Sequence, residues 1–166
     1  MSNHSIAGFA LCATLLGTGL TSAFAADETL RSLAEKNNIY VGAILNSQWF
    51  SGQLPGNYEQ IHKTQFNIVV AENEMKFDAT EPSEGQFNFN NGDKMVKYAK
   101  ANGMRVRGHA LAWHSQVPGW VSQKYGKNKK ELLRVLKNHI EKVVGHWKGQ
   151  IDEWDEIGRA SCRERV

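Results

Sequence analysis

Cysteine is nearly missing from this sequence of 166 residues. The two that occur, Cys12 and Cys162, leave residues 26–155 without any. Small domains that cannot build a sufficient apolar core are usually held together by several disulfides. Because a disulfide framework is excluded between residues 26 and 155, this part of the chain must depend on an apolar core for its stability.

The sequence also lacks an excess of charge of one sign. Its 20 Lys and Arg residues face 17 Asp and Glu residues, which gives a formal net charge of +3. The basic residues are scattered, and the most basic stretch, KYGKNKKELLR, is typical of a solvated helix start. We therefore expect neither a nucleic-acid-binding surface nor attachment to an anionic membrane.

Motifs of several enzyme classes are absent as well. The sequence has no glycine-rich loop of either nucleotide-binding type and no G-x-S-x-G motif. His109 and His114 could be read as metal ligands, but five residues of extended chain would point them to opposite faces, and no Cys assists them. The sequence therefore predicts no metal site.

An uncharged apolar segment lies near the start of the chain. Residues 6–20 carry no charge, and Ala23 and Ala25 form the small-x-small pattern that signal peptidase recognises. The run is too short to span a bilayer, and the residue before Cys12 is not small, which argues against a lipoprotein anchor. We predict a signal peptide over residues 1–25, cleaved near Ala25, and a secreted protein, extracellular or periplasmic, without a membrane anchor.

Strand-like and helix-like segments alternate along the rest of the chain. The runs that read as buried strands are 39–45, 66–72, a run that begins at 104, and 150–155. Helical spacing covers 56–65, 93–103 and 128–149. Spacers of this length call for parallel strands with right-handed crossovers, so the predicted fold class is α/β. Periodicity alone does not decide between an open sheet and a closed barrel.

Apolar spacing indicates which helix faces are buried. In 56–65 it passes through Tyr58 and Ile61, which leaves His62 on a solvated face. In 128–149 the predicted stripe comprises Leu132, Leu136, Ile140, Val143 or Val144, and Trp147. Trp147 and the adjacent His146 are therefore interpreted as core residues rather than ligand-binding residues.

Polar and aromatic side chains gather where the second and third predicted strands end. They are Glu72, Asn73, Glu74 and Lys76 after the second strand, and His109, Trp113, His114, Gln116 and Trp120 in the segment after the third. Because the carboxyl ends of parallel strands line the ligand crevice, these groups can converge on one site. Carboxylate, amide, ammonium and imidazole groups can bridge hydroxyl pairs while indole faces cover pyranose rings, which favours a sugar ligand.

Each of these residues also has a purely structural interpretation. Glu72 and Asn73 can be polar residues that leave a strand, and His109 can be a hydrogen-bonded core histidine. Four polar groups beside a buried strand favour a site, because the cluster is harder to explain than any single member.

The stretches VVAENEMKFDATEPSEGQFNF and GHALAWHSQVPGW, with WD at the end of the fourth strand, closely resemble family 10 of the glycoside hydrolases, the endo-β-1,4-xylanases. The resemblance runs from about Ile39 to Asp155. It implies a secreted enzyme that hydrolyses xylan with retention and without a cofactor. It also implies that residues 26–155 are the N-terminal half of a (β/α)8 barrel, with about four strands.

The resemblance also implies roles for the clustered residues. Glu72, Asn73, Lys76, His109, Trp113 and Gln116 would bind the xylose unit on the non-reducing side of the cleaved bond, with His114 close to the catalytic centre. Phe77 stands where many members have Trp, which leaves the assignment intact. Glu74 is not assigned a role and is expected to face the outer layers of the barrel.

The catalytic glutamates are not among the residues matched. In the family the acid/base follows the fourth strand in the pattern W-D-V-V-N-E, and alignment on Trp154 and Asp155 puts Arg159 at its position. Residues 156–166 resemble a translated sequencing adapter, so Glu156 is excluded and the authentic sequence is expected to end at Asp155. The alternative is a real, exposed, charged tail. We expect this chain by itself to be inactive, with exposed strand edges.

Two other functions stay open at this point. One is a non-catalytic secreted protein that binds carbohydrate, and the other is a related retaining barrel glycosidase such as a cellulase. The expected partners are xylan and xylo-oligosaccharides, with no nucleic acid, and the full-length protein is expected to be a monomer.

Overall fold

The computed structural model describes residues 28–53 and 56–155. The predicted signal peptide, residues 1–25, and the tail, residues 156–166, lie outside the described residues. Within the described part, no helix combines the length and the apolar character that crossing a membrane requires.

Four parallel strands form one sheet in the order β1-β2-β3-β4. They are β1 (Gly42–Leu45), β2 (Ile68–Ala71), β3 (Arg105–His109) and β4 (Glu153–Asp155). The predicted α/β class is thereby confirmed. The strands are shorter than predicted, and the first begins at 42 rather than 39, because Ile39 and Tyr40 are 58% and 57% exposed and precede the paired residues.

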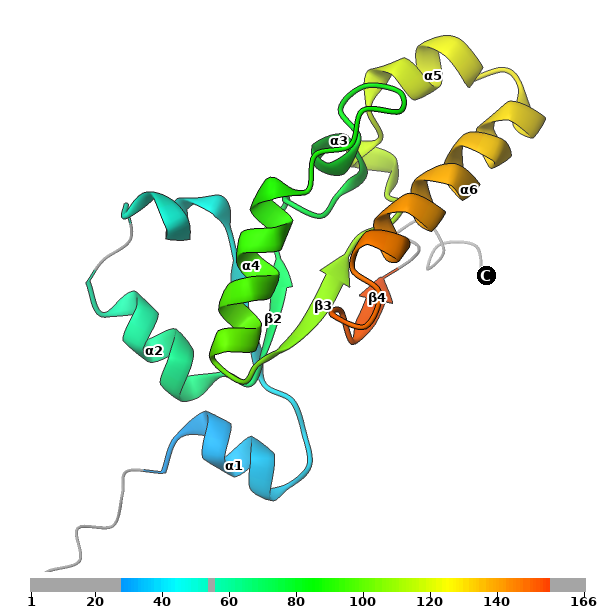
Figure 1. Ribbon diagram of the computed structural model, residues 1–166. Helices are drawn as coiled ribbons and strands as arrows, with labels where there is room; N and C mark the ends of the chain where they lie inside the picture. The colour runs from blue at the N-terminus through cyan, green and yellow to red at the C-terminus, as the bar shows by residue number, and fades with distance from the viewer. Residues whose placement is uncertain (1–27, 54–55, 156–166) are drawn as a thin grey trace, which may run out of the picture.

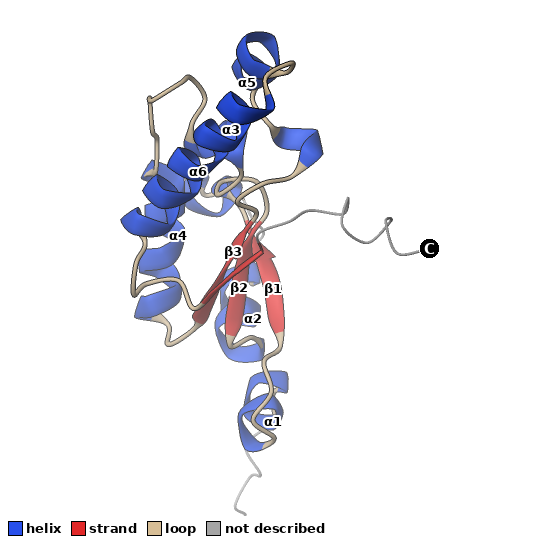
Figure 2. Cartoon of the chain, turned by 90° about the vertical axis from the view of Figure 1, so that its right-hand side faces the viewer, coloured by secondary structure: helices blue, strands red, loops and turns tan. Residues whose placement is uncertain are grey.

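The helices are α1 (Leu30–Lys36), α2 (Tyr58–Gln65), α3 (Phe77–Thr80), α4 (Asn90–Ala101), α5 (Gly119–Tyr125) and α6 (Lys129–His146), with short 3-10 helices η1 (Ser47–Ser51) and η2 (His114–Gln116). Figure 2 shows α4 and α6 on one side of the strands. In Figure 1 the arrowheads of β2 and β3 point toward the end of the molecule that carries α3 and α5.

The two faces of the sheet differ in their cover. Leu45, Val69 and Val106 point to the helical side and pack in one core with residues of α4 and α6, including Met95 and Val143. The opposite face carries Ile44, Val70, Arg107 and Glu153 in register, and Ile44 is 50% exposed. Among the residues that the structure describes, no element covers this second face. It borders an open cavity of about 450 Å³.

Helix α1 lies beyond the amino ends of the strands (Figure 1), where Arg31 links the segments that lead into β2 and β3. Its guanidinium donates hydrogen bonds to the carbonyls of Phe66, Asn102 and Gly103. Gly103 follows α4 with φ of 62°, the left-handed conformation in which glycine commonly ends a helix. This clamp fixes the amino edge of the sheet, opposite to the candidate site.

Two buried histidines correct the predicted helix faces. His62 was expected in solvent but is 2% exposed, whereas Ile61 on the same helix is 47% exposed. The rings of Trp49, Phe66 and Tyr98 surround the His62 imidazole, with centroids 4.7, 5.5 and 6.1 Å away. The apolar spacing of α2 indicates the other face because imidazole counts as polar in a hydropathy pattern, although its ring packs well among aromatic rings.

In helix α6, too, a histidine is buried where the apolar spacing indicates other residues. Its buried line runs through Val135, His139, Val143 and Trp147, and His139 has an exposure of 0%. Leu132, Leu136 and Ile140 of the predicted stripe are only partly buried. Val135 and His139 thus occupy the buried positions that the pattern assigned to Leu136 and Ile140. The difference arises because a hydropathy pattern counts histidine as polar.

Candidate functional site

The polar residues that follow β2 and β3 lie side by side in the folded chain. Gln116 Nε2 donates a hydrogen bond of 3.4 Å to Asn73 Oδ1. The ammonium of Lys76 lies 4.8 Å from the centre of the Trp113 ring, which places a cation over an aromatic face. The structure thus brings together groups that are more than 35 residues apart in the chain, at the carboxyl ends of parallel strands.

Lys76 is held firmly within this cluster. Its side chain is 7% exposed, and its ammonium donates a hydrogen bond of 3.0 Å to Asn73 Oδ1. A buried ammonium group is costly unless its protons find acceptors, so Asn73 and the Trp113 face determine where it lies. Asn73 and Lys76 belong to one turn, in which the Lys76 amide donates a hydrogen bond to the Asn73 carbonyl at 3.0 Å.

Glu72 connects the end of β2 with the end of β1. Asn46 directly follows β1, and its Nδ2 donates a hydrogen bond of 2.9 Å to Glu72 Oε2. The Glu72 amide donates to the Leu45 carbonyl at 3.0 Å, which continues the strand pairing up to this point. Asn46 was not predicted as a site residue, although the signal was present: it is the first polar residue after an apolar strand.

Glu74 points into the site loops and not toward an outer layer. It is 9% exposed, and its two carboxylate oxygens accept hydrogen bonds from the backbone N–H groups of Ser47 and Asn73. A charged acceptor bonded to two amides makes strong hydrogen bonds. Glu74 therefore joins the loop after β1 to the loop after β2, which corrects the expectation stated from the sequence.

His109 is oriented by a residue of the neighbouring strand. His109 and Asp155 are paired in register, and His109 Nδ1 lies 3.0 Å from Asp155 Oδ2. Because a carboxylate only accepts, Nδ1 carries a proton, and in the neutral imidazole Nε2 is then an acceptor. The ring is 6.5 Å from that of Trp113. Sequence reasoning noted Asp155 as part of a motif but missed this function.

His114 lies at the edge of the cluster. It is exposed, begins η2, and its ring centroid is 5.8 Å from that of Trp113. Within residues 28–53 and 56–155, no group of three His, Cys, Asp or Glu side chains is arranged to hold a metal ion.

The cluster offers a hydroxyl-rich ligand several complementary groups. Glu72 and Asn73 supply acceptors, Lys76 and Gln116 supply donors, and Trp113 supplies an aromatic face beside them. Most of these groups are already bonded to one another, so they are fixed in position before any ligand binds. Such preorganisation reduces the entropy that binding would otherwise cost.

Comparison with known proteins identifies a family. The sequence model of glycosyl hydrolase family 10 matches residues 29–160. Endo-1,4-beta-xylanase B of Thermotoga neapolitana is 38% identical over 148 residues, which make up 88% of this chain and 42% of that protein. Beta-1,4-xylanase of Dictyoglomus thermophilum is 44% identical over 104 residues, or 63% of this chain and 29% of that protein.

Solved structures agree with the sequence comparison. Xylanase 10B of Thermotoga petrophila RKU-1, solved in complex with xylobiose, matches with a TM-score of 0.74 and 41% identity over 78% of this chain and 39% of its own. Native xylanase 10B of Thermotoga maritima matches with a TM-score of 0.73 and 41% identity. The chain spans less than half the length of these curated relatives and solved structures.

Proposed function

This chain belongs to glycosyl hydrolase family 10, and from that membership we propose that it is part of an endo-1,4-β-xylanase, which cleaves the β-1,4-xylosidic bonds of xylan with retention. Its four parallel strands and their helices correspond to part of the (β/α)8 barrel of the family. The proposed activity belongs to the whole protein. The relatives of this chain are named as xylanases, and its own site chemistry suits a sugar.

The proposed role of the strand-end cluster is to bind the xylose unit on the non-reducing side of the cleaved bond. Glu72, Asn73, Lys76, His109, Trp113 and Gln116 are the proposed binding residues, and His114 would lie nearer to the reacting bond. The observation that carries this proposal is the hydrogen bond between Gln116 and Asn73, because it joins the two strand ends into one surface.

Retaining hydrolysis needs two carboxyl groups about 5 Å apart, one acting as nucleophile and the other as acid/base. We assign neither role to Glu72 or Glu74. Glu72 accepts a hydrogen bond from Asn46, and Glu74 accepts from two backbone N–H groups, so both carboxylates hold the loops after β1 and β2 in place. The proposed catalytic carboxyl groups are other residues of the whole protein.

Secretion and a monomeric state are further parts of the proposal. The apolar run of residues 6–20 and the Ala23 and Ala25 pattern support export by a signal peptide, with no membrane anchor.

The test is hydrolysis by the full-length protein that contains this chain. Reducing ends released from soluble xylan should far exceed those released from cellulose-derived oligomers at equal concentration. A faster reaction on the cellulose oligomers would instead support a cellulase. Binding of xylo-oligosaccharides with no hydrolysis of either substrate would support a non-catalytic carbohydrate-binding protein.

A further inference from the structure

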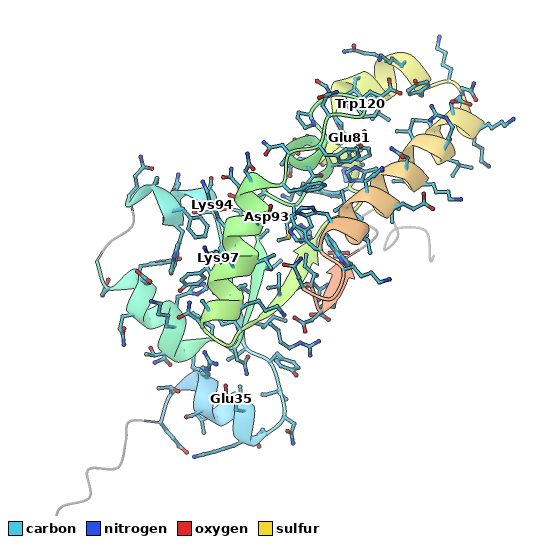
Figure 3. The ribbon with its side chains drawn as sticks, in the orientation of Figure 1. Glu35, Glu81, Asp93, Lys94, Lys97 and Trp120 are labelled. Carbon is cyan, nitrogen blue, oxygen red and sulfur yellow. The ribbon has the colours of Figure 1, made fainter. Side chains whose placement is uncertain are left out.

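Helix α6 carries two histidines that each pair with a carboxylate from another element, Glu81 at the C-cap of α3 and Asp93 of α4. His139 Nδ1 lies 2.9 Å from Glu81 Oε2, and His146 Nε2 lies 2.7 Å from Asp93 Oδ1. The histidines are seven residues apart, which is about two turns and puts both on the same side of the helix. In Figure 3 the labelled Glu81 lies beside α3 and the labelled Asp93 on α4, so the pairs join α6 to different elements.

The imidazoles also stack on phenyl rings. The His139 ring lies 3.5 Å from that of Phe77, at an interplanar angle of 19°. The His146 ring lies 3.9 Å from that of Phe89, at 13°. Both pairs thus combine an imidazole–carboxylate contact with stacking on a phenyl ring, although Asp93 Oδ1 also accepts a hydrogen bond from Trp147 Nε1 at 2.8 Å. Each pair can serve as a control for the other.

The pairs differ in burial. The side chains of His139 and Glu81 are 0% and 1% exposed, whereas those of His146 and Asp93 are 35% and 49% exposed. Burial lowers the pKa of His139, although the Glu81 carboxylate acts in the opposite direction. A buried carboxylate and its donor are expensive to separate, because each would be left without a partner.

Glu81 makes hydrogen bonds through its carboxylate, its carbonyl and its amide. Its Oε1 accepts from the Gly85 amide at 2.9 Å, and its carbonyl accepts from Trp120 Nε1 at 3.2 Å. Its own amide donates to the Phe77 carbonyl at 2.8 Å, which closes α3. The labels of Glu81 and Trp120 are adjacent in Figure 3, where α3 and α5 meet. Glu81 therefore fixes the carboxyl end of α3 to α5, to α6 and to the following loop.

Lys76 lies at the other end of the same short helix. Helix α3 has only four residues, and Lys76 is its N-cap. Both the amide and the hydroxyl of Thr80 donate to the Lys76 carbonyl at 2.9 Å. A single helical turn is not stable alone, so the packing of Phe77 on His139 and the bonds of Glu81 determine where it lies.

We propose that His139 and Glu81 are positioning residues for Lys76. They hold α3 at both ends, through Phe77 stacked on His139 and through Glu81 at the C-cap, and so keep the Lys76 ammonium on Asn73 and against Trp113. Neither residue touches the ligand surface itself. The consequence for xylo-oligosaccharide affinity rests on the proposed function, whereas the consequence for the position of Lys76 does not.

The test uses the full-length protein with His139→Leu, His139→Asn and the control Asp93→Asn. Crystal structures report the separation of Lys76 Nζ and Asn73 Oδ1, and calorimetry reports affinity for xylotriose well below each unfolding temperature. We expect His139→Leu to lengthen the contact and weaken affinity about tenfold, with KM rising more than kcat falls. His139→Asn, whose amide nitrogen takes the place of Nδ1, should recover most of the affinity.

The control separates positioning from general stability. Asp93→Asn weakens the other histidine–carboxylate pair of α6, between His146 and Asp93. It should lower the unfolding temperature while leaving the Lys76 contact and the xylotriose affinity unchanged. A folded His139→Leu variant with the original contact and affinity would overturn the proposal, as would an equal loss of affinity in Asp93→Asn.

Two further results keep the test decisive. If His139→Leu does not fold, Glu81→Met replaces it, because methionine offers no carboxylate oxygen to Gly85 N–H or to His139 Nδ1–H. The same contact and affinity are then measured and overturn the proposal if unchanged. If the unsubstituted protein neither binds nor cleaves xylo-oligosaccharides, the proposed function fails, and the contact in the crystal structures still decides the role of His139 and Glu81.

Discussion

Gln116 and Asn73 are in hydrogen-bond contact, with Gln116 Nε2 3.4 Å from Asn73 Oδ1, although 43 residues separate them in the chain. The contact joins the segment after β3 to the segment after β2. The same Asn73 oxygen also accepts from Lys76 at 3.0 Å. Asn73 is therefore the point at which the two halves of the proposed sugar-binding surface meet.

Lys76→Met removes the ammonium but keeps an unbranched side chain that is only one atom shorter. Hydrogen bonds from charged groups contribute about 1.5–3 kcal/mol, so xylotriose affinity should fall roughly 10- to 100-fold in the full-length protein. Isothermal titration measures the effect. Lys97→Met, at an exposed position of α4, is the control and should bind as the unsubstituted protein does. Equal affinity in both variants would show that the Lys76 ammonium does not contribute to sugar binding.

Glu74→Gln tests the connection between the loops after β1 and β2. Glutamine presents an NH₂ group to one of the two backbone donors, so one N–H is left unsatisfied, and the free energy of unfolding should fall by about 1–3 kcal/mol. Chemical denaturation provides the measurement. Glu35→Gln alters an exposed pair with Arg31 and should change stability by less than about 0.5 kcal/mol. If the two variants were equally stable, Glu74 would not be a structural link.

Asp155→Ala tests the orientation of His109. Without the carboxylate the imidazole loses the partner that keeps the proton on Nδ1, and xylotriose affinity should weaken by roughly 5- to 30-fold. Nitrogen NMR of the His109 ring should show a mixture of tautomers in place of one. A single Nδ1–H tautomer in the variant, with unchanged affinity, would show that Asp155 does not orient the ring.

Acid should destabilise the protein through its buried histidines. Burial lowers the pKa of His62 and of His139 below the ordinary value of 6.5. The unfolded chain therefore binds protons more readily than the folded chain as the pH falls below 6.5, and stability decreases until the folded-state pKa is passed. The slope is at most about 1.4 kcal/mol per pH unit for each histidine.

Urea denaturation between pH 8 and pH 5 measures that slope. His139→Asn should have a shallower dependence than the unsubstituted protein, because one of the two titrating groups is gone. An identical slope in both proteins would mean that His139 does not contribute to acid sensitivity.

The sequence was sufficient to predict the parallel α/β arrangement, because apolar strand runs and helical spacing act locally. It also led to Asn73, Lys76 and Gln116, because polar residues after buried strands stand out in a linear pattern. It did not reveal the burial of His62 and His139. Their environment is created by aromatic and carboxylate groups from other elements, and no periodicity within their own helices records it.

The links made by Glu74 and Asp155 could not be predicted for a related reason. Each one depends on which loop or strand lies next to another in space, as when Glu74 accepts from the Ser47 amide. Residue type and spacing indicate that a carboxylate is present at a strand end. They do not indicate whether it faces a ligand or a neighbouring loop.

A crystal structure of the full-length protein with bound xylotriose tests the central claim most directly. We predict a xylose ring within hydrogen-bond distance of Asn73 and Lys76, with one face against Trp113. Xylotriose bound at another surface, with no sugar in contact with these three residues, would contradict the account.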